Sequence, residues 1–321
     1  MPVPRDGSSL RTFVCMSQTS EPASTATATN TAAVASAPDG APGVDLDAYL
    51  ARTGWSGERR ATTAALRSLH SAHLYGIPFE NLDAVLGSVP SLALPDVEAK
   101  LVRGGRGGYC FEQNTLFAAV LRSFGFHVTL LTARVLRAGG PGAERPRTHM
   151  LLLVRVPGEE QRYIADVGFG GATGLIEAIP LAADTEFRSG GRLHRLVVRE
   201  EHDGPLDLWV LQSPEAGTWA DQYAFTLEPA VRADLEVINW YMATSPRSPF
   251  SRVLSAHRAS PQGHLALRGR TLVETSADGI LKERKLADAD ETVRALTADF
   301  GITLTEPGRV RAAIEAMEEY A

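Results

Sequence analysis

The sequence predicts an α+β fold in which helices come first and strands follow. Apolar residues at helical spacing dominate from residue 44 to residue 125, and short β-rich runs dominate from residue 127 to about residue 230. Beyond Val231 the two patterns mix. Helices and strands do not alternate as they would in a parallel βαβ fold. The 321 residues are enough for two or three domains.

The helical part should begin at Val44-Asp45-Leu46, because Asp45 can cap a short helix that runs through Arg52. In the next helix, Leu66, Leu69 and His73 recur at helical spacing. A glycine-rich loop precedes the last helix of this part, which Gly125 closes. The later helices are expected over residues 58–75, 96–102 and 110–124.

The strands that follow are short runs rich in β-branched and aromatic residues. They are expected over residues 128–135, 150–156, 163–167, 193–199, 206–211 and 223–227. Two helices should end the chain, over residues 290–300 and 307–320, and the second has Pro307 in its first turn.

Residues 1–43 are rich in Ala, Thr, Ser and Pro, as in ASTATATNTAAVASAP. Such a segment buries too little apolar surface to offset the entropy lost on ordering, so a disordered tail is expected. A targeting peptide is the alternative, although basic residues are sparse. Met16 could also be the true start of the protein.

Composition excludes several classes of function. A net charge of -6 does not suit a nucleic-acid surface, and no apolar run reaches the roughly 18 residues of a membrane span. Two cysteines, Cys15 and Cys110, cannot build a disulfide framework. Together with the absence of a visible secretory signal, this favours a cytoplasmic protein that binds neither nucleic acid nor membranes.

The glycine-rich loop 103–109 places Cys110 in the first turn of a helix. The N–H groups and the dipole of a helix start favour a thiolate, and glycines let the backbone approach a substrate closely. A buried structural cysteine is the plain alternative, but burial does not need glycines and an arginine beside it. An RGG-type RNA segment is a second alternative, against which the apolar helix and the acidic net charge speak.

A nucleophilic cysteine needs a base, and the base needs a group that orients it. His149 stands at the mouth of one predicted strand, and Asp166 ends the next. Each residue alone could be structural, as a strand-end histidine or a turn aspartate, but the order Cys, His, Asp favours a triad. The same three residues could also hold zinc, although no HExxH or CxxC occurs. Without GxGxxG or a Walker A sequence, nucleotide chemistry lacks support.

Several segments resemble the arylamine N-acetyltransferases, and the likeness runs from about residue 44 to near the C-terminus. RGGYCFEQN at 106–114 resembles the family's cysteine motif, and IPFENLD at 77–83 resembles the segment upstream of it. Thr148-His149 and DVGFGG at 166–171 are similar to its histidine and aspartate motifs. WYMATSPRSPF at 240–250 resembles a loop of the bacterial members.

The resemblance implies a papain-like core made of a helical bundle, a β-barrel and an α/β lid. The corresponding domains would be a tail at 1–43, a helical domain at 44–127 with the cysteine, a barrel at 128–230 with the histidine and aspartate, and a lid at 231–321. It also implies that Arg52 and Glu80 form a structural ion pair. No metal and no permanently bound cofactor are implied.

The implied activity is ping-pong transfer of acetyl from acetyl-CoA, through Cys110, to arylamines, arylhydrazines or N-hydroxyarylamines. His149, oriented by Asp166, would take the thiol proton. The resemblance allows a homodimer. It assigns substrate binding to Phe79, Val135, Thr148, Gly168, Phe169 and Phe225, although core packing is a second interpretation of Phe225.

Three alternatives remain open. An amide synthase of the same fold, acting on a carrier-bound polyketide, would share the triad. A transglutaminase or cysteine protease would share the order Cys, His, Asp, although the PFEN and GFGG segments favour acetyl transfer. A ligand-binding module with a dead site is the third, and an intact triad speaks against it.

Overall fold

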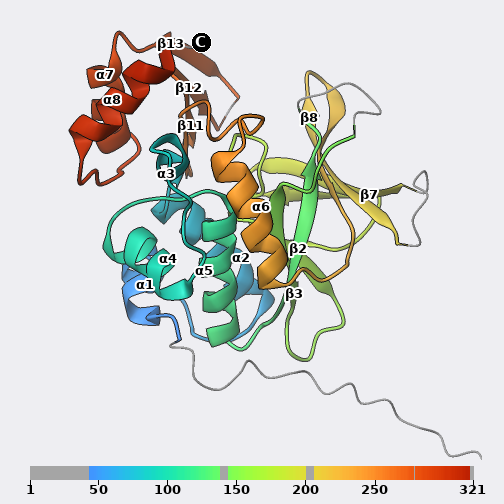
Figure 1. The fold of residues 1–321 in the computed structure, drawn as a ribbon. Helices are drawn as coiled ribbons and strands as arrows, with labels where there is room; N and C mark the ends of the chain where they lie inside the picture. The colour runs from blue at the N-terminus through green and yellow to red at the C-terminus, as the bar shows by residue number, and fades with distance from the viewer. Residues whose placement is uncertain (1–42, 138–143, 200–205, 278, 319–321) are drawn as a thin grey trace, which may run out of the picture. The chain divides into compact units, whose positions relative to one another are not determined.

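The computed structural model describes residues 43–137, 144–199, 206–277 and 279–318 (Figure 1). The expected tail at 1–43 therefore lies almost entirely outside the described residues, as does the end of the last expected helix. Residues 42–321 form one compact unit, and the proposed division of this unit into helical, barrel and lid domains stays a prediction.

The helical part begins as expected, because Asp45 caps α1 by accepting the Ala48 N–H at 3.0 Å. The second helix starts five residues later than expected, since Thr62 provides its cap through the Ala65 N–H. The expected helix at 96–102 is split into an α-helix and a π-helical turn. The elements are α1 Leu46–Thr53, α2 Thr63–Gly76, β1 Phe79–Glu80, α3 Leu82–Val85, α4 Leu94–Glu98, η1 Ala99–Arg103 and α5 Cys110–Ser123.

Within the described residues, eight antiparallel strands form a barrel-like sheet in the order β5-β4-β3-β2-β9-β8-β7-β6. All six predicted strand segments fall within it, with ends that shift by a few residues, and β5 and β6 are additional. The strands are β2 His127–Val135, β3 His149–Arg155, β4 Arg162–Ala165, β5 Ile179–Pro180, β6 Thr185–Ser189, β7 Arg192–Arg199, β8 Leu208–Glu215 and β9 Thr218–Phe225.

A second sheet, in the order β1-β10-β11-β12-β13, joins the short β1 to four later strands. Polar and apolar residues do not alternate regularly along these strands, and every residue of β13 is exposed. The sequence therefore shows only a mixed pattern there. The remaining elements are α6 Arg232–Thr244, β10 Ser255–Ser260, β11 Gly263–Arg268, β12 Thr271–Ser276, β13 Leu281–Lys285, α7 Ala289–Ala298 and α8 Pro307–Glu318.

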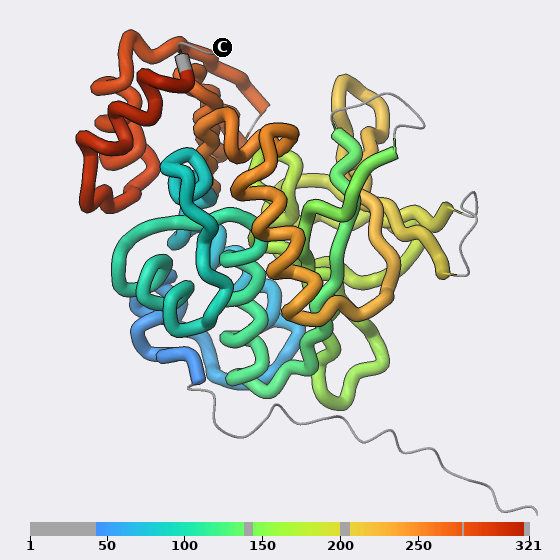
Figure 2. The backbone as a smooth tube through the Cα atoms, in the orientation of Figure 1, coloured from blue at the N-terminus to red at the C-terminus, as the bar shows by residue number. Residues whose placement is uncertain are grey.

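Strand β3 is buried on both faces, and this places the site. Met150, Leu152 and Val154 pack into the core built by α2 and α5, whereas Leu151 and Leu153 pack into the barrel core. Alternation along a strand therefore directs His149, which has the parity of Leu151, toward the barrel core. Helix α5 packs against β2 and β3. The backbone path of these elements can be followed in Figure 2.

Candidate active site

The start of α5 is packed so tightly that glycine is required around Cys110. A Cβ on Gly107 would lie 2.1 Å from the Pro78 carbonyl oxygen. A Cβ on Gly168 would lie 2.6 Å from the Cα of Cys110. The glycine loop can thus pass directly against the upstream segment, and the loop after β4 can approach the thiol, because none of these contacts leaves room for a side chain.

His149 and Asp166 meet at the ends of adjacent strands. His149 is the first residue of β3, and Asp166 follows the last residue of β4. His149 Nε2 and Asp166 Oδ2 are 2.7 Å apart, and both side chains are buried. Because Nε2 is used by the carboxylate, Nδ1 is the ring nitrogen left to exchange a proton with Cys110.

Asp166 is held by three further groups. Its Oδ1 accepts the Asn114 side-chain amide at 3.1 Å and the Gly168 N–H at 3.0 Å. Its own N–H donates to His70 Nε2 at 2.9 Å. His70 Nδ1 must then donate to the Ile176 carbonyl, also at 2.9 Å, so this buried histidine is neutral with a defined tautomer.

The charged forms of His149 and Asp166 stabilise each other. Burial lowers the pKa of His149, but the Asp166 carboxylate and the neighbouring Cys110 outweigh burial and raise it to about 10. Burial raises the pKa of Asp166, and the charge and hydrogen bond of His149, with the bonds from Asn114 and Gly168, lower it on balance. A protonated imidazole beside an ionised carboxylate is therefore the favoured state at neutral pH.

A cavity of about 470 Å³ opens onto Cys110 and His149. Five of the six predicted substrate-binding residues line it, namely Phe79, Val135, Thr148, Gly168 and Phe169. Phe225 is not among the lining residues. It lies in the barrel core with 1% exposure, and its ring stands 6.0 Å from that of Tyr223, so the alternative of core packing describes its position.

Comparisons with known proteins all point to one family of acetyltransferases. The N-acetyltransferase family model matches residues 62–309. An arylamine N-acetyltransferase of Mycolicibacterium smegmatis is 38% identical over 263 residues, which are 81% of this chain and 93% of that protein. The Escherichia coli K12 arylamine N-acetyltransferase is also 38% identical, over 80% of this chain and 88% of its own length.

The solved Mycobacterium marinum arylamine N-acetyltransferase in complex with CoA has a TM-score of 0.80 to this structure. It is 33% identical, and the match covers 85% of this chain and 99% of that chain. The chain belongs to the arylamine N-acetyltransferase family. It is accordingly an acyltransferase of α+β fold.

One expectation taken from the family resemblance is wrong. Glu80 does not pair with Arg52, whose Nε donates to the Leu101 carbonyl at 3.1 Å. Glu80 accepts from Arg106 Nε at 2.8 Å instead. Arg106 lies in the glycine loop and passes the Glu80 carboxylate directly, whereas Arg52 is engaged on the far element η1, so tertiary packing and not charge alone selects the partner.

Sequence reasoning missed several groups that support the site. Asn114 lies four residues after Cys110, which is one helical turn, and this spacing was the available signal. His70, which bonds the Asp166 N–H, and His73, three residues further along α2, both pack edge-on against Phe117. Tyr223, whose ring stands 5.2 Å from that of His149, carried no local signal at all.

Among the described residues, no group of three or more His, Cys, Asp or Glu side chains is arranged to hold a metal ion. In the same part of the chain no helix is long and apolar enough to cross a membrane.

Proposed function

We propose that this acyltransferase takes acetyl from acetyl-CoA onto Cys110 and passes it to an arylamine, an arylhydrazine or an N-hydroxyarylamine. The observation that carries the proposal is the arrangement of Cys110 and His149 on the wall of the large cavity, with Asp166 bonded to His149. The M. marinum relative solved in complex with CoA supports the donor. A cytoplasmic location and a homodimer stay predictions.

In the first half-reaction, His149 Nδ1 takes the thiol proton and leaves a thiolate–imidazolium pair. The thiolate attacks the thioester carbonyl, and backbone N–H groups at the start of α5 can stabilise the oxyanion. The bond between the acetyl carbon and the CoA sulfur then breaks. The imidazolium proton goes to that sulfur, so that CoA leaves as a thiol and the acetyl group stays on Cys110.

In the second half-reaction, the amine attacks the acetyl carbonyl on Cys110. His149 takes the proton that the amine loses, and Cys110 leaves as a thiolate, which restores the pair. Phe79 and Phe169 on the cavity wall favour an aromatic acceptor over water, and this slows hydrolysis of the acetyl-enzyme.

The cavity also suits an anionic donor. Among the described residues, its lining includes four arginines, Arg137, Arg145, Arg247 and Arg268, and no carboxylate, although the whole chain is acidic. Within the described residues, neither Arg247 nor Arg268 forms an ion pair with a carboxylate. Such arginines can neutralise the phosphates of CoA.

The deciding experiment is incubation with acetyl-CoA alone, followed by mass spectrometry of the peptide that contains Cys110. An acetyl adduct on Cys110, which disappears when an arylamine is added, is the expected result. Wild-type protein that forms no adduct would overturn the proposal. A carrier-bound acyl thioester, offered in parallel, separates the amide synthase, which would load from the carrier and not from CoA.

A further inference from the structure

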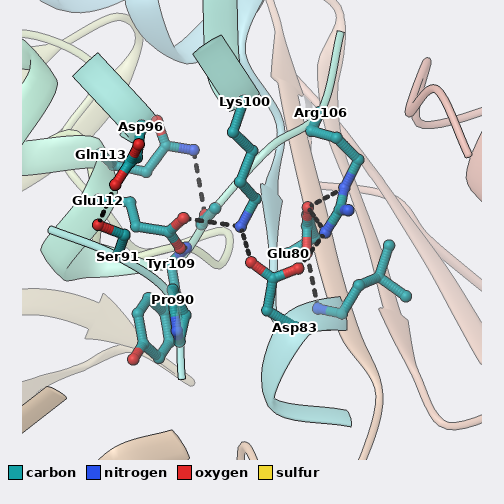
Figure 3. Close-up of polar contacts among 12 residues, drawn as sticks. Glu80, Asp83, Pro90, Ser91, Asp96, Lys100, Arg106, Tyr109, Glu112 and Gln113 are labelled. Carbon is teal, nitrogen blue, oxygen red and sulfur yellow. Dashed lines mark hydrogen bonds and ion pairs between the residues drawn. The ribbon is translucent and has the colours of Figure 1, made fainter. Parts of the chain in front are cut away.

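Five charged side chains lie together beside the glycine loop, and we call Glu80, Asp83, Lys100, Arg106 and Glu112 the Lys100 cluster. Figure 3 shows Lys100 between Asp83 and Glu112, with Arg106 beside Glu80. Lys100 Nζ donates to Asp83 Oδ2 at 2.6 Å and to Glu112 Oε1 at 2.7 Å. Arg106 joins Glu80 to Asp83 at 2.8 and 2.9 Å. The cluster therefore ties η1, α3 and β1 to the first turn of α5.

Through Glu112, the cluster holds the backbone of the residue just before the candidate nucleophile. Glu112 is the third residue of α5, and its Oε2 accepts the Tyr109 N–H at 3.2 Å. A Cβ on Gly108 would lie 2.7 Å from this same oxygen, so glycine at 108 leaves the carboxylate its place. One carboxylate thus holds both Lys100 and the backbone that leads into Cys110.

The charges of the cluster do not balance, because three carboxylates share two cations. Glu80 and Glu112 are 1% exposed. Burial raises the pKa of Glu112 to about 7, although Lys100 acts in the opposite direction, and Glu80 and Asp83 raise it further. Burial lowers the pKa of Lys100, but Glu112, Glu80 and Asp83 together raise it on balance. Lys100 is therefore the charge on which the ionised form of Glu112 depends most.

No member of the cluster lines the cavity, so none of them can touch a substrate there. Burying an unpaired charge is costly, and even a buried ion pair adds little stability compared with apolar residues of the same size. Stability is therefore a weak explanation for the Lys100–Glu112 pair. The bond from the Tyr109 N–H to Glu112 gives the Lys100–Glu112 pair a second role. The charges and N–H groups at the start of a helix influence the reactivity of a cysteine in its first turn.

We propose that Lys100 is a positioning residue for acyl transfer, which holds Glu112 on the Tyr109 N–H, offsets its negative charge and thereby sets the reactivity of Cys110. The inference rests on the proposed role of Cys110 as nucleophile. It concerns the balance of charge at the start of α5, so opposite changes of charge must have opposite effects. The other charged groups there are Glu80, Asp83 and Arg106, and His149 with Asp166 faces the thiol.

The test is the rate of iodoacetamide alkylation of the Cys110 peptide as a function of pH, which needs no acetyl-CoA. Lys100→Met leaves one cation for three carboxylates. Alkylation at pH 7 should slow by about tenfold, with the midpoint of the profile about one unit higher. Lys100→Arg should restore the wild-type profile. Glu112→Gln removes a negative charge while keeping a hydrogen-bond acceptor, and it should move the midpoint down.

The double variant Lys100→Met with Glu112→Gln restores the wild-type net charge of the cluster, and its midpoint should return toward the wild-type value. Arg103→Met is the matched control. Arg103 lies in the same turn η1, but its ion pairs go to Glu98 at 2.5 Å and to Asp45, not to α5. Its profile should not move.

An unchanged profile in Lys100→Met, or an equal shift in Arg103→Met, would overturn the inference. If Lys100→Met does not fold, the downward shift in Glu112→Gln decides, because a purely structural role would not produce it. Failure of the proposed function shows itself separately, as wild-type protein without an acetyl adduct.

Discussion

Two sets of buried or partly buried charged side chains flank the start of α5, and they are built differently. His149 and Asp166 form one short pair, at 2.7 Å, and His149 lines the large cavity. In the Lys100 cluster, Asp83 has two cationic partners and Lys100 has two carboxylate partners, and no member reaches the cavity. The first set can move a proton because His149 lies on the cavity wall with Cys110. The second ties several elements together, because Lys100 and Arg106 each bridge two carboxylates.

The largest effect should follow from removal of the thiol. Cys110→Ala should lower acetyl transfer by a factor on the order of 10⁴ or more, because loss of a nucleophile removes the covalent route. Arylamine acetylation measured with acetyl-CoA tests this, with Cys15→Ala as the matched control that should keep full activity. Normal turnover by Cys110→Ala would refute the proposed mechanism.

A smaller loss is expected for Asp166→Asn, in the range of 10³- to 10⁴-fold in kcat. The amide cannot stabilise the imidazolium, and it favours the wrong tautomer of His149. This carboxylate, acting against burial, is the main cause that raises the pKa of His149 to about 10. Without it the imidazolium should lose its proton at a lower pH than in the wild type, and the thiolate–imidazolium pair is lost with it. Alkylation of Cys110 that stays as fast near pH 7 as in the wild type would contradict this.

Arg106, the second cation of the Lys100 cluster, should act mainly on stability. Arg106→Met leaves Glu80, whose side chain is 0% exposed, without its cation, and should lower the free energy of unfolding by about 3–5 kcal/mol. Arg59→Met is the control, since Arg59 and Asp47 form an exposed pair that should contribute at most about 1 kcal/mol. Urea denaturation measures both. Equal losses would erase the distinction between buried and exposed pairs.

The smallest effect concerns a neutral contact to the same loop. His73 Nε2 bonds Gln113, whose amide donates to the Gly108 carbonyl at 3.1 Å. Burial lowers the pKa of His73 to about 3, so between about pH 6.5 and pH 3 the unfolded chain binds a proton that the folded chain does not. Stability from this group is therefore present above the unfolded pKa and is lost as pH falls.

His73→Gln should reduce the slope of unfolding free energy against pH by about 1.4 kcal/mol per pH unit between pH 5 and 6. Urea titrations at several pH values measure the slope, and the variant of the exposed His127 to Gln should leave it unchanged. An identical slope in His73→Gln would mean that His73 is protonated in the folded protein.

Much of the architecture could be predicted from local patterns. The cap at Asp45, the helix that starts at Cys110 and the strands of the barrel follow from short-range periodicity and capping, and the structure confirms them. The order of Cys110, His149 and Asp166, with glycines beside the first, was enough to nominate the site residues. The chemistry of a side chain follows from its residue type alone, so candidate site residues can be chosen without knowledge of their contacts.

Contacts between residues far apart in the sequence decided how the site is assembled. His70 meets Asp166 across 96 residues, and Glu80 meets Arg106 instead of Arg52 because the glycine loop passes directly against it. Phe225 lies in the barrel core and not on the cavity wall for the same kind of reason. Sequence determined which chemical groups and which local elements this acyltransferase has. Only the tertiary structure decided which buried groups are partners, because the free energy of a buried charge depends on every element packed around it.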